Sequence, residues 1–247
     1  MKKIQILQVP FVDTTQQAFI DQLEEDVKEK QKRFVITANP EIVMQAQKND
    51  TLMRYLHQAD YVTPDGIGVV IGSKLLNQPL KERVTGYDSM MEILKRGDKK
   101  HYRLYLLGAH PETLPLTINN IKNDFPGVQI VGAHHGYFDF EDPAIIDEIK
   151  QTSPDFIFVA LGVPRQEQWI AKHLQAVDNG IFIGVGGSFD VIAGTVKRAP
   201  NFWVKLNLEW LYRLLKQPSR WKRMLSLPHF ALTVLKEKFF NRGTRNE

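Results

Sequence analysis

The sequence predicts an α/β fold in which a doubly wound, mostly parallel sheet of the Rossmann-like kind is followed by a basic, helical C-terminal appendage. Short continuous runs of apolar residues, typical of strands buried on both faces, alternate with segments whose apolar residues recur at helical spacing. Such alternation implies parallel strands joined by helices. The charge changes near residue 200: residues 203–247 contain ten Lys and Arg against three acids, whereas residues 1–202 contain 22 against 25. We therefore assign residues 1–200 to an α/β core and residues 201–247 to the appendage.

Length and composition are those of a soluble globular protein. The chain has 247 residues, of which 43% are hydrophobic and 24% charged, so it can bury a large core. It contains no cysteine, which excludes disulfides, thiolate catalysis and zinc held by cysteine. The apolar run at residues 1–7 is too short for a signal peptide and is typical of a first strand. We expect a cytoplasmic protein.

Three strands are predicted in the first half of the chain, and a helix follows each of them. The strands lie within residues 1–7, 34–36 and 59–62. After the first strand, Thr14 and Thr15 are placed to cap a helix that has acids early and lysines late, as the helix dipole favours. A polar loop at residues 81–88 then precedes a helix predicted over Ser89 to Lys95.

The turn after the third strand carries a candidate catalytic group. It reads Thr63-Pro64-Asp65-Gly66-Ile67-Gly68. In open α/β sheets such strand-to-helix turns line the crevice in which ligands bind. Pro64 fixes φ on one side of Asp65 and Gly66 frees it on the other, and a carboxylate on such a frame is a candidate general base. The alternative is that Asp65 only caps the helix that follows.

A second polar turn is expected at the same edge of the sheet. Asn39 suits the N-cap of the helix after the second strand, and Pro40 suits its first turn. Because the carboxyl ends of parallel strands meet at one edge, we expect Thr37 and Asn39 to lie near Asp65. Plain capping is the alternative for Asn39. In the next polar loop, Arg83 has the geometry to clamp a phosphate, although a solvated surface arginine is the default expectation.

The second half of the chain repeats the strand–helix pattern with glycine turns between the elements. Strands are predicted at residues 104–107, 128–131, 156–159 and 181–183, and helices near residues 112–124, 143–151 and 165–174. The turns lie at residues 108–110, 162–167 and 184–190. Backbone N–H groups in such turns bind anions, so a nucleotide diphosphate is a plausible ligand. The glycines match neither the dinucleotide fingerprint nor a Walker loop.

Several other kinds of chemistry are disfavoured. The seven histidines include no H-E-x-x-H, and we interpret His134 and His135 as loop residues. The acidic run at residues 139–142 precedes Pro143 and is more simply a turn with a helix N-terminus than a cation site. The sequence has no G-x-S-x-G elbow and no convincing D-x-D motif. We therefore expect neither a metal nor another cofactor.

The appendage has the composition of helices that lie on a membrane surface. Tryptophans alternate with lysines and arginines over residues 203–225. The longest uncharged run there, Leu225 to Leu235, has eleven residues and includes a proline, whereas a spanning helix needs about 20 apolar residues. From charge alone, nucleic acid is the first partner that such a basic tail suggests, and an anionic membrane surface or a diphosphate ligand is the second. In the alternative interpretation, the apolar residues of the tail pack on the core; these are Trp203, Leu206, Trp210 and Leu214.

With these residues in view, the chain resembles the WecG/TagA/CpsF family of bacterial glycosyltransferases. The matching stretches span nearly the whole chain, in order, and together they are highly specific. They are Thr37-Ala38-Asn39-Pro40-Glu41, Pro64-Asp65-Gly66-Ile67-Gly68, Arg83-Val84-Thr85-Gly86-Tyr87-Asp88, Leu161-Gly162-Val163-Pro164-Arg165-Gln166-Glu167, Gly184-Val185-Gly186-Gly187-Ser188-Phe189-Asp190 and Gly194-Thr195-Val196-Lys197-Arg198-Ala199-Pro200.

The resemblance implies an inverting transfer of N-acetylmannosamine from UDP-N-acetylmannosamine to undecaprenyl-diphosphate-linked N-acetylglucosamine. In the TagA branch, which the chain resembles most, this is the committed step in making the linkage unit of wall teichoic acid. In the WecG branch the donor carries N-acetylmannosaminuronic acid, and no single residue here separates the two donors. The resemblance also implies that the appendage holds the enzyme on the inner face of the cell membrane and helps to complete the site. It implies no nucleic acid as partner, and it leaves a monomer and a homo-oligomer both open.

Roles for particular residues follow from the same resemblance. Asp65 is the expected base that deprotonates the acceptor hydroxyl. Thr37, Asn39 and Gln166 are expected on the donor sugar or the uridine. The leaving UDP would be neutralised without metal by arginines and by the amides of the glycine turns. These groups are Arg83, Arg213, Arg220, Arg223, Gly186 and Gly187.

Two functions of other classes remain as alternatives. One is a nicotinamide-dependent oxidoreductase, which the missing fingerprint disfavours and which would bind NAD rather than UDP. The other is a non-catalytic nucleotide-sugar-binding protein at the membrane, which would bind UDP-sugars without turnover.

Overall fold

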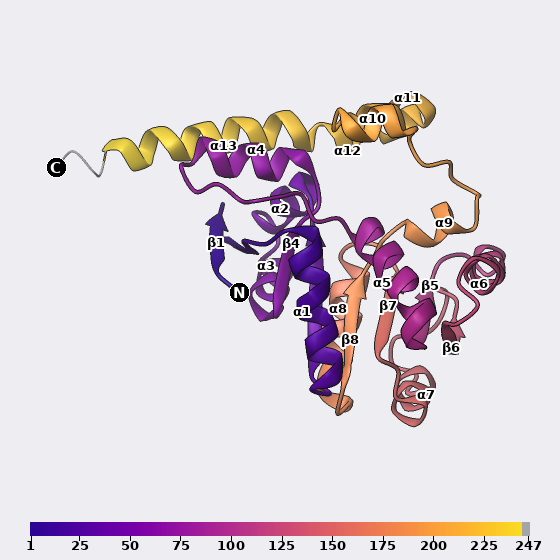
Figure 1. The fold of residues 1–247 in the computed structure, drawn as a ribbon. Helices are drawn as coiled ribbons and strands as arrows, with labels where there is room; N and C mark the ends of the chain where they lie inside the picture. Colours follow the sequence, from indigo (N-terminus) through magenta and orange to yellow (C-terminus); the bar gives the residue numbers. More distant parts are fainter. Residues whose placement is uncertain (244–247) are drawn as a thin grey trace.

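The protein is built on one eight-stranded sheet with helices on both faces (Figure 1). The computed structural model describes residues 1–243, and of residues 220 and 241–243 it describes the backbone alone. The strands are β1 (Lys3–Ile6), β2 (Val9–Val12), β3 (Lys32–Ala38), β4 (Tyr61–Pro64), β5 (Arg103–Gly108), β6 (Gln129–His134), β7 (Phe156–Ala160) and β8 (Gly180–Gly184). They lie in the order β1-β2-β4-β3-β8-β7-β5-β6, and only β1 runs antiparallel to its neighbour. The predicted doubly wound, mostly parallel α/β fold is confirmed.

The helices divide between the two faces of this sheet. One face is covered by α2 (Pro40–Ala46), α3 (Asp50–Gln58), α4 (Ile67–Leu75), α7 (Ala144–Thr152) and α8 (Arg165–His173). The other is covered by α1 (Gln16–Lys28), α5 (Gly86–Lys100), α6 (Thr113–Asp124) and α9 (Ser188–Ile192). A short 3-10 helix, Leu174–Ala176, follows α8. The helices predicted near residues 112–124, 143–151 and 165–174 are therefore present.

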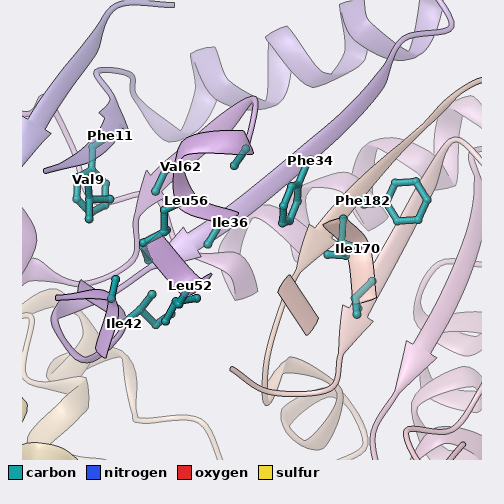
Figure 2. Close-up of a cluster of buried hydrophobic side chains, with 14 of the residues drawn as sticks. Val9, Phe11, Phe34, Ile36, Ile42, Leu52, Leu56, Val62, Ile170 and Phe182 are labelled. Atoms are coloured by element: carbon teal, nitrogen blue, oxygen red, sulfur yellow. The ribbon is translucent and has the colours of Figure 1, made fainter. Parts of the chain in front are cut away.

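Strands β2, β3, β4, β5, β7 and β8 contribute side chains to two separate apolar cores, one on each face of the sheet. In β3, Phe34 and Ile36 face the first core, whereas Val35 faces the second. Figure 2 shows part of the first core, in which Leu52 and Leu56 of α3 lie against residues of the sheet. Because both faces are buried, these strands read as continuous apolar runs in the sequence, which is why their positions were predictable.

The N-termini of α1, α2 and α5 follow local capping signals. The side chains of Thr15 and Asn39 accept hydrogen bonds from the N–H groups of Ala18 and Ile42 and cap α1 and α2. The predicted start of the next long helix at Ser89 is wrong by one turn. Thr85 caps α5 by accepting the N–H of Asp88, so the helix begins at Gly86.

Two elements and one residue were not anticipated from the pattern. Strand β2 contains a proline and is joined to β1 by Leu7 and Gln8, both with positive φ, so the hairpin lacks the usual glycine or asparagine signal. Helix α3 also escaped prediction. The interpretation of His134 as a loop residue is wrong, because it forms the last residue of β6.

After residue 200 the chain forms a row of helices that returns to the first face of the sheet (Figure 1). They are α10 (Asn201–Lys205), α11 (Glu209–Lys216), the 3-10 turn Pro218–Arg220, α12 (Trp221–Met224) and α13 (Ser226–Gly243). Helix α13 lies along α2 and α4, where Phe230 and Val234 are buried. The ring of Phe230 fits here because Gly72 has no side chain: a Cβ there would lie 2.8 Å from the Phe230 ring.

Many large apolar side chains of the appendage are exposed. Of the fourteen large apolar side chains exposed in the described part of the chain, ten lie beyond residue 200. They are Phe202, Leu206, Trp210, Leu215, Trp221, Leu225, Leu232, Leu235, Phe239 and Phe240. The alternative in which the apolar tail residues pack on the core is therefore wrong for Leu206 and Trp210. No helix within residues 1–243 combines the length and the apolar character needed to cross a bilayer.

Candidate active site

The candidate site lies where the carboxyl ends of β3, β4 and β8 meet. Helix α2, which follows β3, covers one face of the sheet, whereas α9, which follows the neighbouring β8, covers the other. This is a topological switch point, at which open α/β sheets form their ligand crevice. The two strand ends are tied together by Thr37, whose Oγ1 donates to the carbonyl oxygen of Gly184 at 3.0 Å. Thr37 thus lies in the crevice as predicted, with its hydroxyl engaged by the protein.

Asp65 occupies the predicted turn between β4 and α4. Its backbone N–H donates to the carbonyl of Ala38 at 3.0 Å, which joins the turn to β3, and its Oδ2 accepts the N–H of Gly86 at 3.4 Å. The N-cap position of α4 belongs to Gly66, with φ of 144°, and no side chain caps this helix. The alternative in which Asp65 is only a capping residue is therefore wrong.

The environment of Asp65 makes its carboxyl group a weaker acid than usual. Burial raises the pKa of Asp65 to about 6, although the Gly86 N–H and the charges of Arg83 and Arg213 act in the opposite direction. Glu209 adds to the increase. A carboxylate with a pKa near 6 is ionised at neutral pH yet basic enough to accept a proton in catalysis.

Asn39 lies beside this turn. A Cβ added at Gly66 would lie 3.7 Å from Cβ of Asn39 and 3.3 Å from Cδ of Pro40, so the two turns are in contact. The Asn39 side chain also caps α2, as the alternative interpretation expected, through its Oδ1. Capping fixes the amide at the edge of the crevice, so the structural role and a position near the ligand coincide.

Arg83 belongs to the core and Arg213 to the appendage, and Glu209 of α11 forms an ion pair with each of them. The guanidinium of Arg83 lies 3.6 Å from a carboxylate oxygen of Glu209, whose other oxygen accepts from Arg213 at 2.5 Å. Both arginines lie close enough to Asp65 to influence its pKa. The structure therefore brings the predicted Arg83, Arg213 and Asp65 together, through an acidic residue that sequence reasoning missed.

A second missed group adjoins Arg83. Asp88 lies 3.7 Å from Arg83 and also pairs with Arg198, whose guanidinium carbon lies 4.4 Å from the ring centroid of Tyr87. The Nε atom of Arg198 is buried and has no hydrogen-bond partner among the described residues. Arg198 and Asp88 are 110 positions apart. Both belong to the motifs that carry the family resemblance, which was the one available signal for them.

Gln166 is buried at the other side of Gly184. A Cβ on Gly184 would lie 2.6 Å from Nε2 of Gln166, so the amide is packed against the strand end that Thr37 binds. Nε2 donates to Oε1 of Glu167 at 2.7 Å. Burial raises the pKa of Glu167 to about 7. The sequence predicted Gln166 as a ligand-binding residue, whereas no role was predicted for Glu167.

The glycine turn after β8 has open space beside Gly186. Gly186 has φ of 50°, and a Cβ at that position would meet no atom within 4 Å. Gly187 follows as the residue that precedes α9. The predicted turn is therefore present at the same edge as Asp65, with room for a ligand above its backbone.

The remaining tail arginines are placed differently. Arg223 pairs with Glu41 of α2, at 2.8 and 3.0 Å, and is more than half exposed. It anchors the appendage beside Asn39 rather than lying next to Asp65. The side chain of Arg220 lies outside the described part of the structure. No three His, Asp or Glu side chains within the described residues are grouped as metal ligands.

The chain matches the family described as "Glycosyl transferase WecG/TagA/CpsF family" over residues 4–244. It is 43% identical to the N-acetylglucosaminyldiphosphoundecaprenol N-acetyl-beta-D-mannosaminyltransferase of Bacillus spizizenii, over 94% of this chain and 91% of that protein. Proteins of the same name are 41% identical in Bacillus subtilis, over 93% of this chain and 90% of theirs, and 38% identical in Staphylococcus aureus, over 96% and 93%.

Proposed function

This chain belongs to the WecG/TagA/CpsF family of glycosyltransferases, and from that premise we propose that it transfers N-acetylmannosamine from UDP-N-acetylmannosamine to undecaprenyl-diphosphate-linked N-acetylglucosamine. The product belongs to the linkage unit of wall teichoic acid. Relatives that carry the name of this activity cover almost the whole chain. The observation in the structure that carries the proposal is Asp65, a carboxylate of raised pKa at a topological switch point with two arginines beside it.

Asp65 is the general base of this reaction. The acceptor hydroxyl attacks the anomeric carbon from the face opposite the UDP, so the configuration inverts and one base suffices. Asp65 removes the hydroxyl proton as the new glycosidic bond forms. Its turn is fixed by hydrogen bonds to Ala38 and Gly86, so the carboxylate is positioned before the substrate binds. A positioned base typically contributes ~10²–10⁴ in rate.

Arg83 and Arg213 stabilise the leaving UDP. Negative charge develops on the diphosphate as the bond to the sugar breaks, and both guanidinium groups belong to the same site as Asp65, whose pKa they lower. The open amides of the turn at Gly186 and Gly187 supply further donors. Thr37, Asn39 and Gln166 contact the donor sugar or the uridine. Because arginines and amides provide the neutralisation, the reaction needs no metal.

The appendage binds the inner face of the cell membrane. Its ten exposed large apolar side chains offer a surface that can enter the interface between water and lipid. Residues 203–247 carry ten Lys and Arg, and each contributes about 1 kcal/mol near anionic lipid. The same segment carries Arg213 to the site, so attachment to the membrane and completion of the site are linked.

The test is release of UDP from UDP-N-acetylmannosamine with a short-chain lipid-diphosphate N-acetylglucosamine acceptor in detergent. Wild-type protein and Asp65→Asn are compared, and one arm contains a chelator. We expect acceptor-dependent release that survives the chelator and decreases at least about 100-fold in the variant. The variant should still bind UDP, since its fold and its arginines are unchanged.

Other outcomes would replace parts of the proposal. Release only with UDP-N-acetylmannosaminuronic acid would assign the chain to the uronic acid donor. Binding of UDP-sugars with no release from either donor would identify a nucleotide-sugar-binding protein. Loss of activity on chelation would contradict the metal-independent mechanism.

A further inference from the structure

The amide of Gln166 and the carboxyl group of Glu167 form an isolated polar pair inside the protein. Gln166 is 2% exposed and Glu167 is 1% exposed. Nε2 of Gln166 donates to Oε1 of Glu167, and a hypothetical Cβ on Gly184 would lie only 2.6 Å from this nitrogen. Oε1 of Gln166 and Oε2 of Glu167 have no hydrogen-bond partner among the described residues. A buried acceptor without a hydrogen-bond donor lowers the stability of a protein by about 1–3 kcal/mol. Two such acceptors side by side therefore need an explanation.

Helix capping does not supply one. Glu167 is the third residue of α8, the position from which a capping-box glutamate reaches back to the N–H of the N-cap residue. The N-cap residue here is Pro164, which has no N–H. The side chain of Glu167 instead accepts from its own neighbour, Gln166.

The pair is placed to present one free acceptor to the donor site. Gly184 separates Gln166 from Thr37, whose hydroxyl bonds to the Gly184 carbonyl. On the far side of Thr37, a Cβ added at Gly86 would lie 3.0 Å from the Thr37 hydroxyl, and the N–H of Gly86 donates to Asp65. The Gln166 amide therefore belongs to the crevice of the reaction. With its NH₂ group held by Glu167, its carbonyl oxygen is the atom left for a ligand.

We propose that Glu167 is a positioning residue for the donor site: it holds the NH₂ group of Gln166 and so orients Oε1 of Gln166 to accept a hydrogen bond from an N–H of the nucleotide sugar. The inference rests on the proposed function, because it requires a UDP-sugar in this crevice. Two parts of such a donor carry a suitable N–H, namely the uracil ring and the acetamido group. A positioning role requires that Glu167 acts only through Gln166.

The experiment is a double-mutant cycle on full-length protein, read by calorimetric binding of UDP and of UDP-N-acetylmannosamine. Glu167→Met removes the acceptor at similar size, Gln166→Leu removes the amide, and the double variant removes both. We expect each single variant to raise the Kd about 10-fold and the double variant to raise it no further. KM for the donor should follow Kd while kcat changes less than about twofold.

Glu167→Gln serves as the conservative variant, because its amide oxygen still accepts from Gln166. It should fold and bind within about twofold of wild type, so it tests the proposal even where Glu167→Met is unstable. The matched control is Glu148→Met on α7. It removes a carboxylate that accepts a hydrogen bond from the hydroxyl of Tyr105 at 2.5 Å. It should lower the melting temperature without changing either Kd.

The outcomes separate the sources of the N–H and the competing explanations. If the single variants bind UDP itself about 10-fold more weakly, the N–H belongs to uracil. If only the affinity for UDP-N-acetylmannosamine falls, the N–H belongs to the acetamido group. The proposal would be overturned if Glu167→Met raised the Kd by the same factor in the wild-type background and in the Gln166→Leu background. A 10-fold increase in Kd for Glu167→Gln would also overturn it. Wild-type protein that binds neither ligand would overturn the proposed function and this inference with it.

Discussion

The core and the appendage use apolar side chains in opposite ways. In the core, aromatic residues such as Phe158 and Trp169 are completely or almost completely buried between the sheet and its helices. In the appendage, Phe230 and Val234 are buried, whereas ten large apolar side chains face solvent. Most large apolar side chains of the core are therefore buried, whereas most of those in the appendage are exposed.

This difference teaches how the site is assembled. Thr37 lies at the end of β3, Asp65 in the turn after β4 and Gln166 in the first turn of α8, whereas Arg213 lies on α11 of the appendage. Helix α11 contacts the core through the pair between Glu209 and Arg83, and the helices after it contact the core through the buried Phe230 and Val234 and the pair between Arg223 and Glu41. We therefore propose that Asp65, the base, is positioned by the core alone, whereas Arg213 reaches the site only when the appendage is docked.

Arg213→Ala tests that dependence with the largest expected effect. Loss of one group that stabilises developing charge typically costs ~3–4 kcal/mol in the transition state, so kcat/KM should fall more than about 100-fold. Steady-state UDP release measures it. The control is Lys216→Ala on the same helix, which is exposed and should leave kcat/KM within about twofold. Equal effects of the two variants would contradict a specific role for Arg213.

Phe230→Ala and Phe239→Ala compare a buried and an exposed ring on the same helix. Phe230 is 3% exposed and Phe239 is 66% exposed. Truncating the buried ring should cost about 3 kcal/mol of stability, measured by denaturant unfolding. Removing the exposed ring should change stability by less than about 0.5 kcal/mol but weaken binding to anionic vesicles. Comparable destabilisation by both variants would show that α13 does not dock as described.

The pH dependence of the reaction tests the environment of Asp65. Since burial raises its pKa to about 6, Asp65 is protonated and inactive as a base below that pH. We expect kcat/KM to fall about tenfold per pH unit below pH 6 and to level off above it. The sign for stability is opposite: a raised folded pKa favours the fold at low pH, and this contribution is lost as pH rises through 6. Asp65→Asn should therefore stabilise the protein more at pH 8 than at pH 4.

Arg223→Ala should have the smallest effect. The pair between Arg223 and Glu41 has an exposed cationic partner, and such pairs contribute about 0–1 kcal/mol. The unfolding free energy should change by less than about 1 kcal/mol, and kcat on a water-soluble acceptor by a few-fold at most. A loss as large as that of Arg213→Ala would place Arg223 on the substrate, as the sequence predicted.

The parts of the fold that could be predicted depend on local signals. A few adjacent residues determine the buried strands, the caps at Thr15 and Asn39 and the turn that carries Asp65, so all of them can be predicted from the sequence. Strand β2 was not predicted because its hairpin turn consists of Leu7 and Gln8 at positive φ, and neither residue type is typical of such a turn.

The site was predictable only in part for a related reason. Thr37 lies at the end of a strand and Asn39 and Asp65 directly follow strands, and the geometry of a parallel sheet brings strand ends together. Glu209 reaches Arg83 from another region of the chain, and Arg198 reaches Asp88 across 110 positions, so neither contact leaves a periodic or local signature. The orientation of Gln166 by Glu167 depends on side-chain geometry that spacing does not encode.

The central claim is that the active site is complete only with the appendage docked. The most direct measurement is UDP release by protein lacking residues 203–247, on a water-soluble acceptor, with folding followed by circular dichroism. A water-soluble acceptor removes any need for membrane attachment, so the assay reports the site alone. We predict a folded core, somewhat less stable because Phe230 and Val234 no longer cover α2 and α4, and no measurable turnover. Full activity of the truncated protein would contradict the account.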